Sequence, residues 1–179
     1  MRRMAERFRD ISRFISQRAA ADPCLRGMGT TMTLACSLGL ELVLCHIGDS
    51  RAYLFRQDAV RQLTRDMTMA QELIQAGMLN PAQSATYRFR HVLTQCLGAP
   101  GTAKADVRHL TLRDDDQLLL CSDGLYDMVD DGLIADTLQG AASPQSACQT
   151  LVDRALDAGG KDNITVIVAH FRHAPWVDG

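Results

Sequence analysis

The stretch ELVLCHIGDSRAYLFRQDAVRQL, residues 41–63, contains three β-prone runs: Glu41–Ile47, Arg51–Arg56 and Ala59–Leu63. Turn-forming residues separate these runs, first at 48–50 and then at 57–58. Connections this short join strands as hairpins, because a parallel pair needs a crossover of about a dozen residues or more. The stretch therefore predicts an antiparallel sheet.

Strand and helix signals continue on both sides of this stretch. Further strands are expected at Thr30–Leu38, Ala105–Leu112, Gln117–Ser122 and Ile164–Phe171. Helices are expected at Met1–Ala21, Thr68–Gly77, Leu125–Val129, Asp131–Leu138 and Ser143–Ala158. Residues 78–90 show little periodicity and are expected to form a surface loop or flap. Hairpins followed by a helix pair and a closing strand indicate an α+β domain.

Two of the expected helices have a readable apolar face. The first repeats apolar residues at helical spacing, at Met4, Phe8, Ile11 and Ile15, and six arginines make it basic. The last places Ala147, Cys148, Leu151, Val152, Ala155 and Leu156 on one side. We predict a surface helix for the first segment and a core-packed helix for the second.

Composition excludes several classes of protein. The chain has 179 residues, 46% hydrophobic and 22% charged, which is typical of one globular domain. Its net charge of −2 lacks the basic excess of an electrostatic nucleic-acid binder. No apolar run approaches the roughly 20 residues that span a bilayer. We expect a cytoplasmic protein with neither nucleic acid nor a membrane as partner.

The six cysteines form no C-x-x-C pair and no zinc-finger spacing. Free structural thiols are therefore favoured over a disulfide framework. Cys36, Cys45 and Cys121 stand inside apolar runs and are expected to be small core residues.

Two aspartates stand at strand boundaries. Asp123 directly follows the run 118–122, and Asp162 comes just before the last expected strand. If those strands are neighbours, both carboxylates meet at one sheet edge, where their repulsion calls for a cation such as Mg²⁺ or Mn²⁺. Asp49 lies at another strand end and is a third candidate. The alternative is that all three are ordinary turn residues, as Asp in glycine-containing turns often is.

Six segments, taken in order, resemble the metal-dependent protein phosphatase family of the type 2C kind (PPM type), its bacterial branch in particular. They are Gly27-Met28-Gly29-Thr30-Thr31, Gly48-Asp49-Ser50-Arg51, Leu63-Thr64-Arg65-Asp66, Val92-Leu93-Thr94-Gln95-Cys96-Leu97-Gly98, Cys121-Ser122-Asp123-Gly124-Leu125-Tyr126-Asp127 and Lys161-Asp162-Asn163-Ile164-Thr165-Val166. Each segment alone is a weak signal, but six in the family's order are specific.

The resemblance implies a four-layer α-β-β-α sandwich with two antiparallel sheets, and a centre of two Mn²⁺ or Mg²⁺ ions, or three in bacterial members. It implies hydrolysis of phosphoserine or phosphothreonine in a phosphoprotein by a metal-activated water, opposing a bacterial Ser/Thr kinase. By position, Asp123 and Asp162 match two metal ligands, and Asp49 matches the carboxylate of the third metal. Residues 69–90 correspond to the flap beside the active site.

The family's opening third has no counterpart before Gly27, including a segment whose aspartate bridges the two metals. No general acid is identifiable for the same reason. The expected organisation is thus an N-terminal amphipathic helix (1–26), a partial, N-terminally truncated phosphatase domain (27–171) and a tail (172–179). Three explanations stay open: a fragment, a non-catalytic member, or a chain completed by another chain. The functional alternatives are a pseudophosphatase that binds phosphoproteins or a partner, and the branch that dephosphorylates anti-sigma-factor antagonists.

Overall fold

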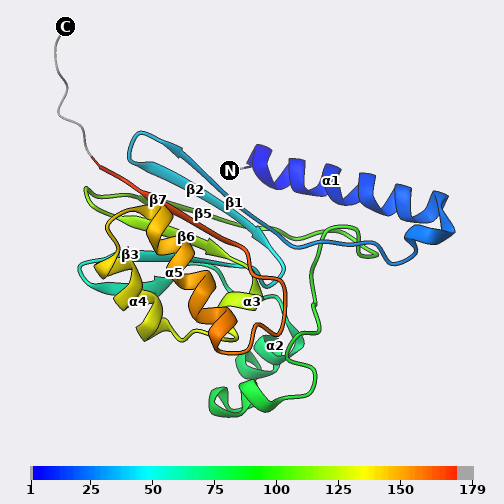
Figure 1. Cartoon of the computed structure of the whole chain (residues 1–179). Coiled ribbons are helices and arrows are strands. Elements are labelled where there is room, and N and C mark those ends of the chain that lie inside the picture. Colours follow the sequence, from blue (N-terminus) through cyan, green and yellow to red (C-terminus); the bar gives the residue numbers. More distant parts are fainter. Residues whose placement is uncertain (1, 173–179) are drawn as a thin grey trace, which may run out of the picture. The chain divides into compact units, whose positions relative to one another are not determined.

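The computed structural model describes residues 2–172, which form two compact units (Figure 1). Unit 1 comprises residues up to 38, residues 42–50 and residues 65–110. Unit 2 comprises residues 39–41, 51–64 and those from 111 onward. Each unit contains one β-sheet, and both sheets are antiparallel, so the expected α+β class is confirmed.

Unit 1 is built on a three-stranded sheet in the order β1-β2-β5. Its strands are β1 (Met32–Leu38), β2 (Glu41–Ile47) and β5 (Asp106–Thr111), with Glu41 and Thr111 at the boundary to unit 2. Its helices are α1 (Arg2–Ala21) and α2 (Met69–Gln75), with short 3₁₀ turns η1 (Pro23–Leu25) and η2 (Pro81–Thr86). The turn η2 lies in the segment expected to be irregular, where Asn80 caps it and Pro81 is its first residue.

Helix α1 packs on the sheet of unit 1 through Phe8, which is only 1% exposed and clusters with Cys45, Ile47 and Leu97. The expected apolar face is wrong at Ile11, which is 37% exposed. Ser12 takes the buried position instead, at 4% exposed, because its Oγ accepts a hydrogen bond of 3.0 Å from the backbone N–H of Gly98. A buried polar group is tolerated when it is paired in this way.

His46 is a buried residue of β2, with 1% of its surface exposed. Its Nδ1 lies 2.9 Å from the Thr33 hydroxyl and its Nε2 lies 3.2 Å from the Arg65 carbonyl oxygen. Burial lowers the pKa of His46 below its usual 6.5, even though the carbonyl of Arg65 acts in the opposite direction. His46 is therefore held neutral in the folded protein.

This buried histidine predicts a loss of stability in mild acid. The unfolded chain binds a proton near pH 6.5 and the folded chain does so only at lower pH, so stability should fall as the pH drops below about 6.5. The slope reaches at most about 1.4 kcal/mol per pH unit for one group. Urea unfolding between pH 5 and 7.5 measures it. His46→Gln should flatten the slope, whereas His109→Gln, on the exposed side of β5, should leave it; equal slopes in both variants would contradict the assignment.

Unit 2 is built on a four-stranded sheet in the order β4-β3-β6-β7. Its strands are β3 (Arg51–Arg56), β4 (Ala59–Gln62), β6 (Gln117–Cys121) and β7 (Val166–His170), and every neighbouring pair is antiparallel. Its helices are α3 (Asp123–Tyr126), α4 (Asp131–Gly140) and α5 (Pro144–Asp157). Helices α4 and α5 lie over one face of this sheet (Figure 1). Their side chains share one buried cluster with those of the sheet, which includes Tyr53, Leu119, Ile134, Leu138 and Leu151.

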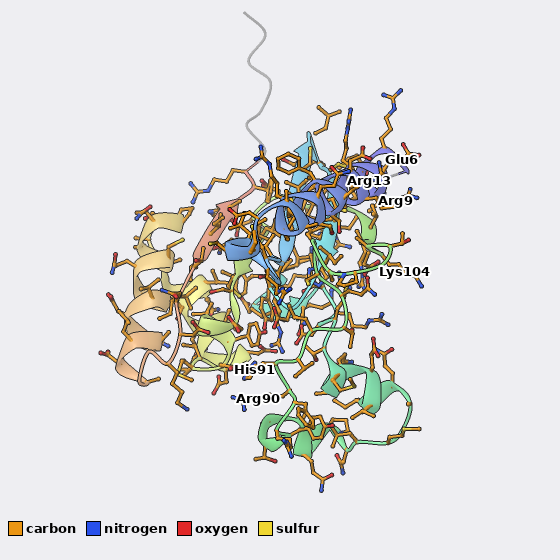
Figure 2. The ribbon with its side chains drawn as sticks, turned by 90° about the vertical axis from the view of Figure 1, so that its right-hand side faces the viewer. Glu6, Arg9, Arg13, Arg90, His91 and Lys104 are labelled. Atoms are coloured by element: carbon orange, nitrogen blue, oxygen red, sulfur yellow. The ribbon has the colours of Figure 1, made fainter. Side chains whose placement is uncertain are left out.

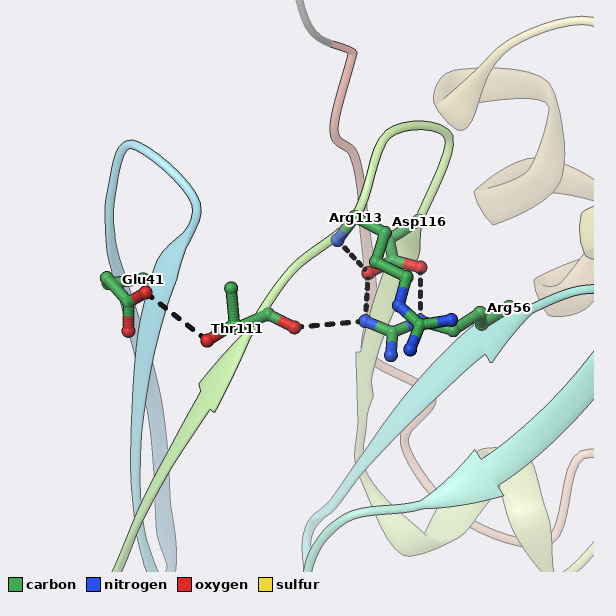
Figure 3. A network of polar contacts seen from close by, with 5 residues as sticks. All are labelled: Glu41, Arg56, Thr111, Arg113 and Asp116. Atoms are coloured by element: carbon green, nitrogen blue, oxygen red, sulfur yellow. Dashed lines mark hydrogen bonds and ion pairs between the residues drawn. The ribbon is translucent and has the colours of Figure 1, made fainter.

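A buried ion pair between Arg56 and Asp116 lies at one end of the unit 2 sheet (Figure 3). The Arg56 guanidinium donates from Nε to Asp116 Oδ1 at 2.8 Å and from Nη2 to Oδ2 at 2.6 Å. Oδ2 also accepts from the backbone N–H of Arg113 at 2.7 Å, and Asp116 is only 1% exposed. Burial raises the pKa of Asp116, but the hydrogen bonds from Arg56 and Arg113 outweigh it and hold the pKa below its usual 3.8.

The helix starts expected at Thr68, Asp131 and Ser143 are confirmed, whereas the helix expected at Leu125–Val129 runs from Asp123 to Tyr126, because Ser122 is its N-cap. Ser143 and Ser146 form a reciprocal capping box with Pro144 at the first turn of α5, and Asp130 caps α4 through the N–H of Leu133. Thr68 caps α2 through the N–H of Gln71. The buried face of α5 is wrong at Leu156, which is 56% exposed, because the helix contacts the core through Ala147, Leu151 and Ala155.

All six cysteines lie within the described residues and are free thiols. Cys45 and Cys121 are core residues as expected, and burial raises the pKa of Cys45 to about 11. Cys36 is exposed, so that expectation is wrong: β1 is the outer strand of its sheet, and its second half is solvent-exposed. Within residues 2–172 no helix combines the length and apolarity needed to cross a membrane. Residues 173–179 of the expected tail lie outside the described residues.

Candidate functional site

Strand register brings three strand ends of unit 2 into line. Arg51, the first residue of β3, lies opposite Cys121, the last residue of β6. Cys121 in turn lies opposite Val166, the first residue of β7. Asp123 is two residues beyond Cys121 and Asp162 is four residues before Val166. The condition for convergence is met, because β6 and β7 are neighbours and the two aspartate-bearing segments leave the sheet at the same edge.

The hydroxyl of Ser122 ties these two segments together. Its Oγ donates to the carbonyl of Asn163 at 3.1 Å and accepts from the N–H of Thr165 at 3.0 Å. The backbone N–H of Ser122 donates to the carbonyl of Thr165 at 3.1 Å. Three hydrogen bonds therefore fix the residue before Asp123 to Asn163 and Thr165, which lie one and three residues after Asp162.

Gly124 lets the two segments approach each other. A Cβ atom at this position would lie 2.4 Å from the Asn163 carbonyl oxygen and 2.9 Å from its carbon. These are backbone atoms that cannot swing aside, so only glycine fits. The requirement is close packing, since Gly124 lies within α3.

Asp123 and Asp162 are both accessible enough to bind a ligand. Asp123 is half-buried as the first residue of α3, and its Oδ1 accepts from the N–H of Gly124 at 3.0 Å. Asp162 is exposed, and its Oδ1 accepts from the N–H of Asn163 at 2.7 Å. Asp123-Gly124, which also fits a simple turn in sequence, thus begins a helix, and each carboxylate keeps its second oxygen out of these local bonds.

Arg51 supplies a positive charge beside α3. Its guanidinium lies 3.6 Å from the ring centroid of Tyr126 and donates to the Tyr53 hydroxyl at 2.9 Å. Burial raises the pKa of Tyr53, so that phenol stays protonated. Arg51 is thereby held by a stacking contact and a hydrogen bond at the edge where β3 begins.

Asp49 lies in unit 1, two residues before Arg51, and is 8% exposed. Its turn is fixed within unit 1: a Cβ at Gly48 would lie 2.4 Å from Thr31 Cγ2, and Gly48 has a φ of +110°. The Gly48 carbonyl accepts from the N–H of Met67 at 2.8 Å. Thr31 and Ser50 pair through their hydroxyls at 2.9 Å.

The donor chemistry fits Mg²⁺ or Mn²⁺, since carboxylate oxygens are what such hard ions prefer. Within residues 2–172, no group of three or more His, Cys, Asp or Glu side chains is placed to hold a metal ion. The candidate ligands in unit 2 are therefore the pair Asp123 and Asp162, whose segments meet at one end of the sheet. Mg²⁺ in proteins commonly uses one or two carboxylates and keeps several waters, so the pair suits an ion that is partly held by water and substrate.

The chain matches known proteins over nearly its whole length. The family model described as Stage II sporulation protein E (SpoIIE) matches residues 3–172. The serine/threonine phosphatase stp of Listeria welshimeri is 31% identical over 165 residues, or 92% of this chain and 66% of that protein. The solved S. agalactiae serine/threonine phosphatase has a TM-score of 0.88 at 31% identity, covering 92% of this chain and 68% of that one. The PstP catalytic domain with two manganese ions has a TM-score of 0.80 at 36% identity, covering 90% and 67%.

The fold, with its two antiparallel sheets, is thus shared with solved serine/threonine phosphatases. The chain belongs to the bacterial PPM-type phosphatase family. It spans about two thirds of the length of the Listeria relative.

Sequence reasoning missed two contributors to this edge. The sequence assigns no role to Ser122. Its hydrogen bonds to the Asn163 segment depend on the pairing of β6 with β7, which no local pattern reveals. Arg51 was likewise unassigned, although its place immediately after Asp49-Ser50 and at a strand start was the available signal.

Proposed function

We propose that this chain carries part of the active site of a metal-dependent protein serine/threonine phosphatase. The observation that supports it most is the meeting of the Asp123 and Asp162 segments at one sheet edge, tied by Ser122. The substrate would be a phosphoserine or phosphothreonine protein, the product of a bacterial Ser/Thr kinase. Relatives named serine/threonine phosphatases favour this class over one specialised for anti-sigma-factor antagonists.

Asp123 and Asp162 would hold Mn²⁺ or Mg²⁺, with Asp49 as the ligand of a further, weaker ion. When bound, two such ions supply an activated water at neutral pH and neutralise phosphoryl oxygens. Ser122 and Gly124 would keep the two carboxylate segments in register. Arg51 would add a fixed positive charge at the same edge, which favours an anionic substrate.

A phosphoprotein-binding pseudophosphatase is the second candidate. It is favoured by one observation: within residues 2–172, no group of three or more His, Cys, Asp or Glu side chains is placed to hold a metal ion. Such a protein would bind the same substrates without hydrolysing them.

Phosphate release from a phosphothreonine peptide tests the two candidates. The assay is run on this chain with Mn²⁺, with and without a chelator, beside the Asp123→Asn variant. We expect chelator-sensitive turnover that Asp123→Asn abolishes. A folded chain that binds the phosphopeptide but releases no phosphate would favour the pseudophosphatase, and a folded chain that does neither would overturn both.

Asp123 and Asp49 should also contribute differently to the affinity of the chain for Mn²⁺. We expect Asp123→Asn to weaken Mn²⁺ binding by about tenfold or more, since it removes one of two ligands of the main ion. Asp49→Asn should change that affinity by less, because Asp49 is assigned to a separate, weaker ion. Calorimetric titration with Mn²⁺ measures both, and equal or reversed losses would contradict the peripheral assignment of Asp49.

A further inference from the structure

The two units carry opposite charge. Unit 1 contains twelve Lys and Arg against seven Asp and Glu, whereas unit 2 contains seven against fourteen. The near-neutral net charge of −2 hides this difference. Unit 1 therefore offers the surface to which an anion would be attracted, and the 20-residue helix α1 carries much of the positive charge.

A pocket of about 320 Å³ lies in unit 1 between α1 and the loop 100–103. Arg9 and Arg13 line it from the helix; four residues apart, they occupy the same helical face. Thr102 lines it from the loop, and no Asp or Glu of residues 2–172 is part of its lining. Figure 2 shows Arg9 and Arg13 toward the same side of unit 1 as Lys104, which follows the loop; Glu6, one turn before Arg9, is outside the pocket lining.

Two serines of α1 hydrogen-bond to Gly98, which comes shortly before the loop that lines the pocket. Ser12 Oγ accepts from the Gly98 N–H at 3.0 Å, and Ser16 Oγ donates to the Gly98 carbonyl at 3.1 Å. Both serines also line the pocket. Ser12 is 4% exposed, and among residues 2–172 its own hydroxyl proton meets no acceptor. The buried serine thus keeps one donor for a molecule in the pocket.

The loop supplies further donors. Within residues 2–172, the backbone N–H groups of Gly101, Thr102 and Ala103 donate to no acceptor, whereas the next one, of Lys104, donates to Gln95 at 3.1 Å. Ala103 is only 8% exposed, and a backbone N–H in so buried a residue is costly to leave unpaired. Gly101 has a φ of +97°, a conformation common in loops that wrap anions with successive N–H groups.

We propose that this pocket binds a phosphoryl anion. Two guanidinium groups match phosphate oxygens by charge and geometry, and the loop N–H groups and the hydroxyls of Ser12 and Thr102 supply the remaining donors. Asp10 competes for Arg13, but this pair is long, at 3.8 Å, and exposed, so a phosphoryl group can displace it. An adjoining pocket of about 440 Å³ shares Ser16 and Pro100 with this one and leaves room for a larger molecule that carries the phosphoryl group.

The experiment is an NMR titration of the ¹⁵N-labelled chain with sodium phosphate, with sodium chloride at equal ionic strength as reference. We expect saturable shifts at the amides of Gly101, Thr102 and Ala103 that chloride does not produce. Arg9→Ala/Arg13→Ala should weaken this binding by at least about tenfold, because it removes two charge-assisted contacts. Arg3→Ala/Arg7→Ala removes the same charge from the same helix outside the pocket lining and should change the affinity by less than about twofold.

Two further arms identify the source of the phosphoryl group and separate this site from the proposed active site. A phosphothreonine peptide that binds about tenfold more tightly than phosphate would indicate a phosphorylated protein; equal affinities would indicate free phosphate. Asp123→Asn should leave the loop shifts unchanged, whatever its effect on turnover. Shifts that do not saturate, that chloride reproduces, or that both arginine pairs weaken equally would overturn the proposal.

Discussion

Asp116→Ala should lower the free energy of unfolding by about 3 kcal/mol, because removing one partner of a buried ion pair leaves the other without compensation. Arg56 loses both of its hydrogen bonds to the carboxylate, and the Arg113 N–H loses its acceptor. For a chain of this size the melting temperature should drop by roughly 6–12 °C. Thermal unfolding by circular dichroism measures it.

Asp114→Ala is the matched control, since Asp114 is an exposed residue of the same turn. Its effect should stay within about 0.5 kcal/mol. The difference between the two variants should also depend on pH. The folded pKa of Asp116 lies below its usual 3.8, so the stabilisation is fully present above about pH 4 and is lost as the pH falls through the folded value. A similar loss in both variants at pH 7 would show that the ion pair contributes nothing.

Gly124→Ala should damage both stability and the candidate site. The added methyl group cannot fit 2.4 Å from the Asn163 carbonyl oxygen, so the segment carrying Asp162 must move away from Asp123. Overpacking of this kind costs about 1–3 kcal/mol. If the proposed phosphatase activity is present, a displacement of about 1 Å should reduce turnover by on the order of a hundredfold. Urea unfolding and phosphate release from a phosphothreonine peptide are the two measurements.

Gly140→Ala is the control for this substitution. Gly140 is the last residue of α4, and an added Cβ there would meet nothing within 4 Å. Alanine is the better helix former, so this variant should be unchanged or more stable by up to about 1 kcal/mol, with normal turnover and Mn²⁺ affinity. Mn²⁺ titration serves as the second readout of the site. A Gly124→Ala protein that matches Gly140→Ala in stability and Mn²⁺ affinity would refute the role of close packing.

Features set by neighbouring residues in sequence could be predicted. The helix starts at Thr68, Asp130 and Ser143 depend on side chains that bind a backbone N–H three positions further along the chain, so the expected helices begin there. The bounds of β2 and β3 were predicted correctly because turn residues flank both strands. These helix starts and strand bounds depend on residues that are close together in the sequence.

Features set by tertiary partners could not be predicted in this way. Cys36 has the pattern of a core residue, yet it lies on the outer strand of its sheet, and strand order is not encoded in a single strand. Ser12 replaces Ile11 in the interior only because Gly98, which is 86 residues away, supplies its partner. The convergence of Asp123 and Asp162 was likewise conditional on β6 pairing with β7. The candidate residues can thus be named from the sequence, but the strand pairing that brings the Asp123 and Asp162 segments together cannot be predicted from it.

The order of strands in unit 2 also means that β3 is synthesised long before its partner β6. The hairpin β3–β4 ends at Gln62, but β6, which pairs with the other side of β3, is complete only at Cys121. The chain synthesised in between includes residues 65–110, which belong to unit 1. At about 5–20 residues per second, roughly 3–12 seconds pass before β6 can pair with β3, and Leu54 and its neighbours stay uncovered for that time. A nascent chain paused in that window exposes an apolar, unpaired strand edge, which is the surface that holdase chaperones bind and that aggregation begins from.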